Sequence, residues 1–153
     1  MTQKELNDIA YRVVACAIEV HKQLGPGLLE SIYEECFIEE LRLNGLYVTS
    51  QEKIPLVYKG KLLKNGLKLD VLVNDCIIVE LKAVEEIKPL FKAQLLTYLK
   101  LAGIPKGLLI NFNCVNIASQ GLVSLVTEKF ANLSKEEKII GYRIINLVNL
   151  SVT

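Results

Sequence analysis

Residues 67–82 read LKLDVLVNDCIIVELK, and they decide the fold. Two apolar runs, 67–73 and 76–82, flank a central Asn-Asp pair, which favours a turn. The pattern therefore predicts two antiparallel strands joined by a tight connection. The second run begins with four consecutive apolar residues, which is typical of a central strand covered on both faces.

Three charged side chains interrupt this strand pair, namely Asp70, Glu80 and Lys82. Glu80 and Lys82 are two positions apart, so they point to the same face of the sheet. Charged groups on a central strand are costly to bury unless they are paired or bind an ion. Carboxylate and carbonyl oxygens suit Mg²⁺ or Mn²⁺, and a neighbouring lysine can orient a water molecule. A Glu80–Lys82 pair at a solvated strand end is the competing interpretation.

The connection between the strands decides whether Asp70 and Glu80 meet. A two-residue turn at Asn74 and Asp75 would put the two carboxylates on opposite faces of the sheet. A three-residue loop, 74–76, would place them opposite each other, and so would a bulge. We expect one of these two arrangements, with an Asn or Asp residue in the left-handed conformation.

The remaining sequence predicts a mixed central sheet flanked by helices, which is an α/β fold. Helical spacing of apolar residues predicts three helices, at about 4–24, 28–43 and 89–102. Further strands are expected at 47–49, 54–58, 61–63 and 107–112. In the second helix the side chains expected to face the core are Leu29, Ile32, Cys36, Phe37 and Leu41. Ser134 indicates a further helix start, and residues 143–148 an edge strand.

Length and composition fit one domain over residues 1–153, with a core at about 5–115 and a C-terminal extension at 116–153. The 153 residues are 51% hydrophobic and 23% charged, which is enough to build a core. We expect no signal peptide and no membrane span. The four cysteines lack metal-site spacing, and reduced thiols without an export signal predict a cytoplasmic location. The chain has a single histidine, His21, which excludes metal sites built from several histidines. Its expected role is that of a polar residue near the C-terminal end of the first helix, where it interacts favourably with the helix dipole.

The net charge of +1 gives no general support to nucleic-acid binding, but the charges are unevenly distributed. A lysine-rich stretch without acidic residues contains Lys53, Lys59, Lys61, Lys64 and Lys68. An acidic segment contains Glu30, Glu34, Glu35, Glu39 and Glu40. Each is either a solvated face or a functional surface, and the lysines are candidates for a substrate groove.

Three motifs give a family resemblance. Leu69-Asp70-Val71-Leu72 followed by Val79-Glu80-Leu81-Lys82 resembles the D…(D/E)-x-K signature of the PD-(D/E)xK nuclease superfamily, although Leu69 replaces the name-giving proline. The segment from Gln94 to Tyr98 matches the Q-x-x-x-Y motif of its exonuclease-like branch. The segment from Gly27 through Glu30 to Tyr33 matches the G-x-x-E-x-x-Y signature of the GxxExxY proteins. The motifs follow the family's order.

The resemblance implies a restriction-endonuclease-like core and metal-dependent hydrolysis of phosphodiester bonds in nucleic acid, with DNA as the expected substrate. Asp70, Glu80 and the backbone carbonyl of Leu81 would bind Mg²⁺ or Mn²⁺, with Lys82 positioning the attacking water. Glu30 would approach the metal directly or through water. The side chains expected to contact the substrate or orient the site are Tyr33, Lys68, Gln94 and Tyr98.

Two alternatives stay open at this point. One is a module that binds nucleic acid or a protein without cleaving, since a fold does not establish a function. The other is an oligomeric interaction domain, because residues 139–152 are rich in apolar side chains that would form a packed strand or a dimer edge. A homo-oligomer or a protein partner is compatible with either.

Overall fold

The structure is a computed structural model that describes residues 1–135. Its helices and strands follow the predicted order of two helices, a group of strands, a helix and a further strand. They are α1 (Gln3–Leu24), α2 (Glu30–Leu43), β1 (Val48–Ile54), β2 (Val57–Tyr58), β3 (Lys61–Leu62), β4 (Leu67–Val73), β5 (Ile77–Lys82), α3 (Pro89–Ala102), β6 (Lys106–Asn111), a π-helical turn η1 (Ile117–Gly121), β7 (Leu122–Val126) and α4 (Glu128–Ala131).

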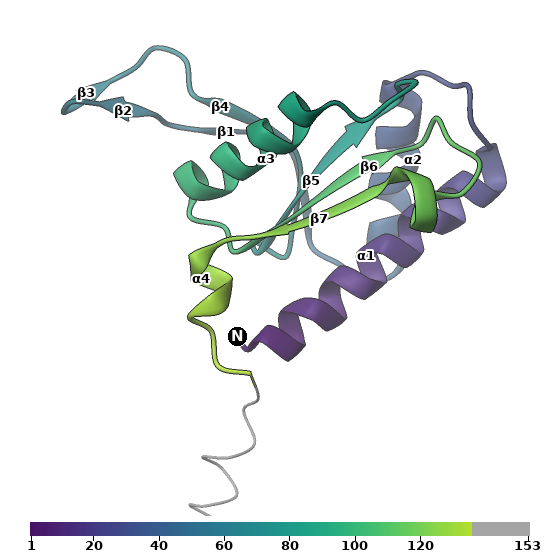
Figure 1. Cartoon of the computed structure of the whole chain (residues 1–153), viewed down its shortest axis with the longest axis horizontal. Helices are drawn as coiled ribbons and strands as arrows, with labels where there is room; N and C mark the ends of the chain where they lie inside the picture. Colours follow the sequence, from purple (N-terminus) through teal and green to yellow (C-terminus); the bar gives the residue numbers. More distant parts are fainter. Residues whose placement is uncertain (136–153) are drawn as a thin grey trace, which may run out of the picture.

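A five-stranded sheet in the order β1-β4-β5-β6-β7 forms the centre of the fold (Figure 1). β5 and β6 run parallel, and the other neighbouring pairs are antiparallel. Helix α3 connects the two parallel strands, as such a connection requires a crossover. The predicted mixed sheet flanked by helices is therefore confirmed.

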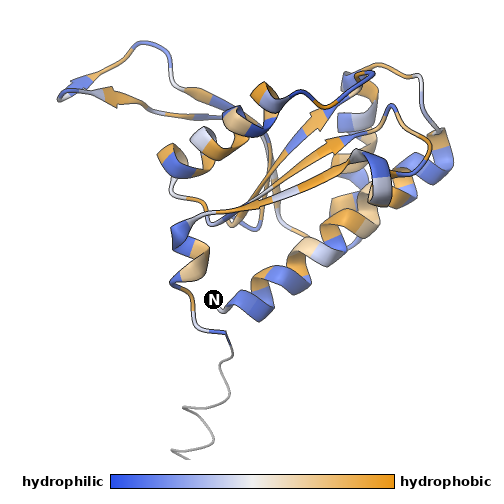
Figure 2. Cartoon of the chain, in the orientation of Figure 1, coloured by the Kyte–Doolittle hydropathy of each residue, from blue (hydrophilic) through white to orange (hydrophobic). Residues whose placement is uncertain are grey.

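Helices cover both faces of this sheet. α1 and α2 share one core with β5 and β6, built around fully buried residues such as Phe37 and Phe112. α3 packs on the opposite face through Leu95 and Leu99. The strands between these layers are strongly hydrophobic (Figure 2), which explains the apolar run at the start of β5. The site residues on β4 and β5 are thus held on a rigid sheet.

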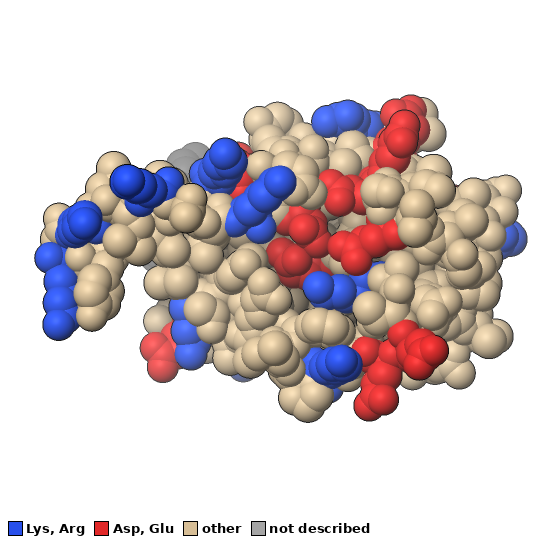
Figure 3. All heavy atoms as spheres, turned by 90° about the horizontal axis from the view of Figure 1, so that it is seen from above, with Lys and Arg blue, Asp and Glu red and all other residues tan. Residues whose placement is uncertain are grey.

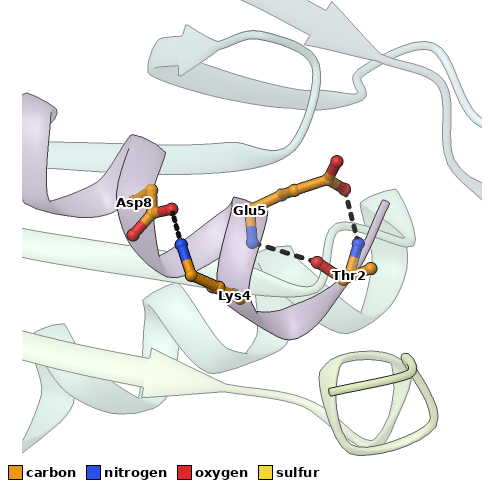
Figure 4. A network of polar contacts seen from close by, with 4 residues as sticks. All are labelled: Thr2, Lys4, Glu5 and Asp8. Atoms are coloured by element: carbon orange, nitrogen blue, oxygen red, sulfur yellow. Dashed lines mark hydrogen bonds and ion pairs between the residues drawn. The ribbon is translucent and has the colours of Figure 1, made fainter. Parts of the chain in front are cut away.

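Helix α1 begins at Gln3 because its first turn is closed by a capping box (Figure 4). The Thr2 hydroxyl accepts a hydrogen bond from the Glu5 backbone N–H at 3.1 Å, and Glu5 Oε2 accepts one from the Thr2 backbone N–H at 2.8 Å. Lys4 and Asp8 add an exposed ion pair of 2.8 Å on the next turn. Two N–H groups of the helix end are thereby satisfied.

The predicted inner face of α2 was partly wrong. Leu29 and Ile32 are exposed, at 71% and 40% of their surface, whereas Tyr33 is fully buried. Tyr33 continues a buried row at a spacing of four residues with Phe37 and Leu41. The aromatic residue with a polar tip is tolerated inside because its hydroxyl finds hydrogen-bond partners there.

The connection between β4 and β5 is the three-residue loop, one of the two arrangements that the sequence predicted. Val73 pairs with Ile77, so residues 74–76 are the loop. Asn74 and Asp75 both have positive φ, 48° and 54°. Short polar side chains tolerate this left-handed conformation better than other residues with a Cβ.

The chain beyond β6 shows what the sequence pattern did not resolve. β7 extends the sheet antiparallel to β6, and α4 follows it. The helix predicted after Ser134 and the strand predicted at 143–148 lie outside the described residues. Within residues 1–135, no helix is both long and apolar enough to cross a membrane.

Candidate active site

The site forms where β4 diverges from β5. The two strands are paired from the loop to Val71 and Val79. One step further, Asp70 and Glu80 oppose each other in the same register, and the Leu81 N–H donates a hydrogen bond of 3.1 Å to Oδ2 of Asp70. A side-chain acceptor thus takes the place of a backbone carbonyl. The carboxylate of Asp70 is thereby fixed against the backbone of β5.

Glu80 is a buried carboxyl group beside a second one. Only 8% of its surface is exposed, and its Oε1 atom has no hydrogen-bond partner among the described residues. Burial raises the pKa of Glu80 to about 9, and the charge of Asp70 and a hydrogen bond with its side chain add to the shift. Lys82 and the Asp70 backbone oppose the shift. Such a group is a strong candidate for binding a cation, since an unpaired buried acceptor is costly.

Lys82 lies on the same face of β5 as Glu80, since the two are separated by two positions. Its Nζ atom is 4.4 Å from the centroid of the Phe91 ring, which belongs to α3. A cation over an aromatic face is electrostatically stabilised. The ring therefore supports the ammonium group, which interacts electrostatically with Glu80, without neutralising it.

The backbone of Leu81 faces β4. Lys82 accepts a hydrogen bond of 2.9 Å from the Phe112 N–H, just past the end of β6, so its backbone points away from β4. Neighbouring residues of a strand direct their N–H and C=O groups to opposite sides. The Leu81 carbonyl is consequently on the side of Asp70, where the sequence analysis expected a third oxygen ligand.

Glu30 is the first residue of α2 and lies near this cluster. Burial raises its pKa, as does the charge of Asp70, while Lys82 lowers it. Figure 3 shows acidic side chains gathered around a basic one in the middle of one face. Within residues 1–135, however, no three acidic, histidine or cysteine side chains form a set placed to hold a metal ion. The approach of Glu30 to a metal, directly or through water, stays a prediction.

The loop before α2 is held by Tyr33. Its hydroxyl donates to the Gly25 carbonyl at 2.5 Å and accepts from the Leu28 N–H at 3.1 Å. Between them, Gly27 has φ 99°, a conformation that residues with a Cβ rarely adopt. The expected substrate contact of Tyr33 is corrected here, because its side chain has no exposed surface. Its observed role is to position the loop that leads into Glu30.

The other expected substrate residues are accessible but not joined to the acidic cluster by any hydrogen bond within the described chain. Gln94 is exposed on α3 and donates a hydrogen bond of 2.9 Å to the hydroxyl of Tyr98. Lys68 is exposed on β4, two residues before Asp70. Their roles stay predictions.

Asn111 was missed by the sequence analysis. It is 3% exposed, lies opposite Lys82 at the end of β6, and donates to the Val84 carbonyl at 2.8 Å. Its Oδ1 accepts from the Val84 N–H at 3.0 Å and from the Asn113 N–H at 3.2 Å. These bonds fix the chain directly after Lys82. Asn111 could have been identified from the sequence as a polar residue at the end of a buried strand, which is the same pattern that identified Glu80.

The fold and the acid–lysine cluster define a restriction-endonuclease-like α/β domain. A family model described as the PD-(D/E)XK nuclease superfamily matches residues 7–122, and the chain belongs to this superfamily. The matched region contains every residue of the cluster. No curated protein and no solved structure matched the chain.

The pKa of Glu80 makes the stability of the metal-free protein depend on pH. Between its ordinary value of 4.5 and about 9, the folded state holds a proton that the unfolded state has lost. Stability from this carboxyl therefore falls as pH rises, by at most about 1.4 kcal/mol per pH unit. We expect Glu80→Gln, which stays neutral, to remove this slope. Urea unfolding of both proteins in EDTA between about pH 5 and about pH 9 measures how the free energy of unfolding changes with pH. The same pH dependence in the wild type and in Glu80→Gln would contradict the raised pKa of Glu80.

Proposed function

We propose that this chain hydrolyses phosphodiester bonds in DNA, with a Mg²⁺ or Mn²⁺ ion held by Asp70, Glu80 and the Leu81 carbonyl. The observation that carries the proposal is the buried Glu80 carboxyl opposite the carboxylate of Asp70, with its Oε1 atom unpartnered among residues 1–135. Two adjacent carboxyl groups repel when both are ionised, and a divalent cation relieves that repulsion. An all-oxygen donor set also fits the preference of these ions.

The chemistry follows from the groups around the cation site. A bound divalent ion would supply positive charge beside the scissile phosphate and favour ionisation of a water molecule. Lys82 donates hydrogen bonds to the attacking water or to a phosphate oxygen and stabilises the charge that develops there. The water oxygen gives up a proton and forms a bond to phosphorus, the bond to the sugar oxygen breaks, and that oxygen gains a proton from the surrounding water. Glu30 accepts a hydrogen bond from water at the site.

Three finer assignments belong to the same proposal. Gln94 and Tyr98, joined by their hydrogen bond, orient a substrate phosphate from α3. Membership of the GxxExxY branch is supported by Gly27, Glu30 and Tyr33, because the glycine and the tyrosine together shape the loop before Glu30. A cytoplasmic location is consistent with the four free cysteines.

Metal binding tests the core of this proposal. We expect Asp70→Asn to lower the affinity for Mn²⁺ by at least about 100-fold, because it removes one of two anionic ligands. Isothermal titration calorimetry with Mn²⁺ and Mg²⁺ measures this. Asp75→Asn is the matched control, since Asp75 is exposed at the tip of the same hairpin, and it is expected to bind like the wild type.

Cleavage of linear single-stranded and double-stranded DNA then separates the two functional alternatives. Metal-dependent degradation that Asp70→Asn lacks supports the nuclease. Negligible heats for both the wild type and Asp70→Asn would refute the metal site. DNA binding without cleavage under either metal would favour the non-cleaving module.

A further inference from the structure

The segment from residue 53 to residue 68, here called the basic arm, starts and ends in the central sheet, and its middle part projects from the body of the protein. β1 and β4 pair as far as Ile54 and Leu67, and the chain then forms a separate two-stranded sheet, β2–β3. Figure 1 shows this hairpin projecting from the central sheet. Every residue from 57 to 66 is exposed, including Tyr58 at 62%. A two-stranded hairpin alone is marginally stable in water, so an arm of this kind suits contact with a partner.

The charge of the arm indicates what that partner is. The arm carries five lysines and no acidic residue, and Figure 3 shows basic side chains along it on the face that also shows the acidic cluster. The whole chain carries only +1, so the remainder is net negative. None of the five lysines forms an ion pair with another described residue. A polyanion is therefore the complementary partner.

Two placements of lysine are unfavourable for the arm alone. Lys53 and Lys68 are direct cross-strand partners at its base, and like charges opposite each other destabilise a sheet. Lys59 occupies the turn at the tip with φ 47°, a position where Asn, Asp or Gly is preferred. Both costs are offset if the lysines contact phosphate groups.

The reach of the arm fits a nucleic acid held at the cluster. Lys61 precedes Asp70 by nine positions, so at about 3.3 Å per residue the arm extends up to roughly 30 Å from that carboxylate. One turn of B-DNA is about 34 Å long. We propose that the basic arm binds the phosphate backbone of duplex DNA within about one helical turn of the bond to be cleaved. This inference rests on the proposed function for the position of the DNA.

Binding measured by fluorescence anisotropy in EDTA, without cleavage, tests the arm. The variant Lys59→Gln/Lys61→Gln/Lys64→Gln is expected to lose about ten-fold or more in affinity for a duplex of about 30 bp. Its plot of log affinity against log salt should be shallower by roughly 2–3, since three phosphate contacts are lost.

A charge-matched control and a second variant exclude trivial explanations. Lys22→Gln/Lys100→Gln/Lys135→Gln removes the same charge from exposed positions elsewhere and is expected to retain most of the affinity. Lys53→Gln/Lys68→Gln should lower DNA affinity while leaving the thermal unfolding midpoint unchanged or higher, which a purely structural role would not produce.

The outcomes distinguish the arm from the nuclease proposal. Equal losses in the arm and control triple variants, or no loss in the arm variant, would overturn the inference. Failure of the wild type to bind the DNA duplex of about 30 bp, or tighter binding of an RNA duplex of the same sequence, would also overturn it. Arm-dependent DNA binding by a protein that cleaves nothing would support the arm and reject the nuclease.

Discussion

Replacing Lys82 by methionine is expected to lower the rate of metal-dependent DNA cleavage by at least about 100- to 1000-fold. The ammonium group lies over the Phe91 ring and interacts electrostatically with Glu80 and Glu30, so we expect it to contact the reacting phosphate. Methionine fills similar volume and can still contact the ring. The variant should therefore fold, because only the charge and its hydrogen bonds are removed.

Rates with Mg²⁺ or Mn²⁺ and DNA affinities in EDTA should be measured on the same preparations. We expect the affinity to change little, since most binding energy for DNA comes from contacts to many phosphates. Lys22→Met is the control, because Lys22 is an exposed lysine in the last turn of α1. This variant should cleave DNA at the wild-type rate. Cleavage by Lys82→Met within about three-fold of the wild type would exclude the lysine from the chemistry.

The register of the β4–β5 hairpin shows how much a sequence can predict about a site. The requirement that Asp70 and Glu80 share a face, combined with an Asn-Asp pair tolerant of positive φ, led to a three-residue loop or a bulge as the two alternatives, and the structure has the loop. Side chains of a strand alternate between the two faces of the sheet, so one extra residue in the loop decides whether Asp70 and Glu80 lie on the same face. Here local chemistry and the functional hypothesis gave the same answer.

The distance from Glu30 to the carboxyl groups was not predictable, because α2 is packed onto the sheet by contacts between residues far apart in sequence. The inner face of α2 illustrates the reason. Tyr33 is buried in place of Ile32 because its hydroxyl bonds the Gly25 and Leu28 backbone and its ring meets Phe112. None of these contacts follows from helical periodicity alone.

The end of the chain is the other part that the pattern failed to resolve. β7 lies at the edge of the sheet and contains only half-buried and exposed residues, whereas every residue of β6 is buried. Asn111 was overlooked for a related reason, since its partners are the backbone groups of Val84, which only the folded sheet brings near it. Both the edge strand β7 and the role of Asn111 depend on tertiary contacts rather than on the secondary-structure propensity of the local sequence.

Phe112→Ala is expected to lower the free energy of unfolding by about 3–5 kcal/mol. The ring is fully buried and stacks on Tyr33 with 4.5 Å between ring centroids, while Phe37 meets it edge-on at 6.4 Å. Its removal leaves a cavity and forfeits both aromatic contacts. For a domain whose total stability is about 5–15 kcal/mol, this is a large fraction.

The same substitution connects the core to the site, because the Phe112 N–H bonds the Lys82 carbonyl and the ring supports Tyr33, which positions the loop before Glu30. Urea unfolding followed by circular dichroism measures the loss, with Phe112→Leu as the matched control that retains most of the volume and should cost less than half as much. A loss below about 1 kcal/mol for Phe112→Ala would show that the neighbouring side chains close the cavity, and that the aromatic cluster does not hold α2 on the sheet.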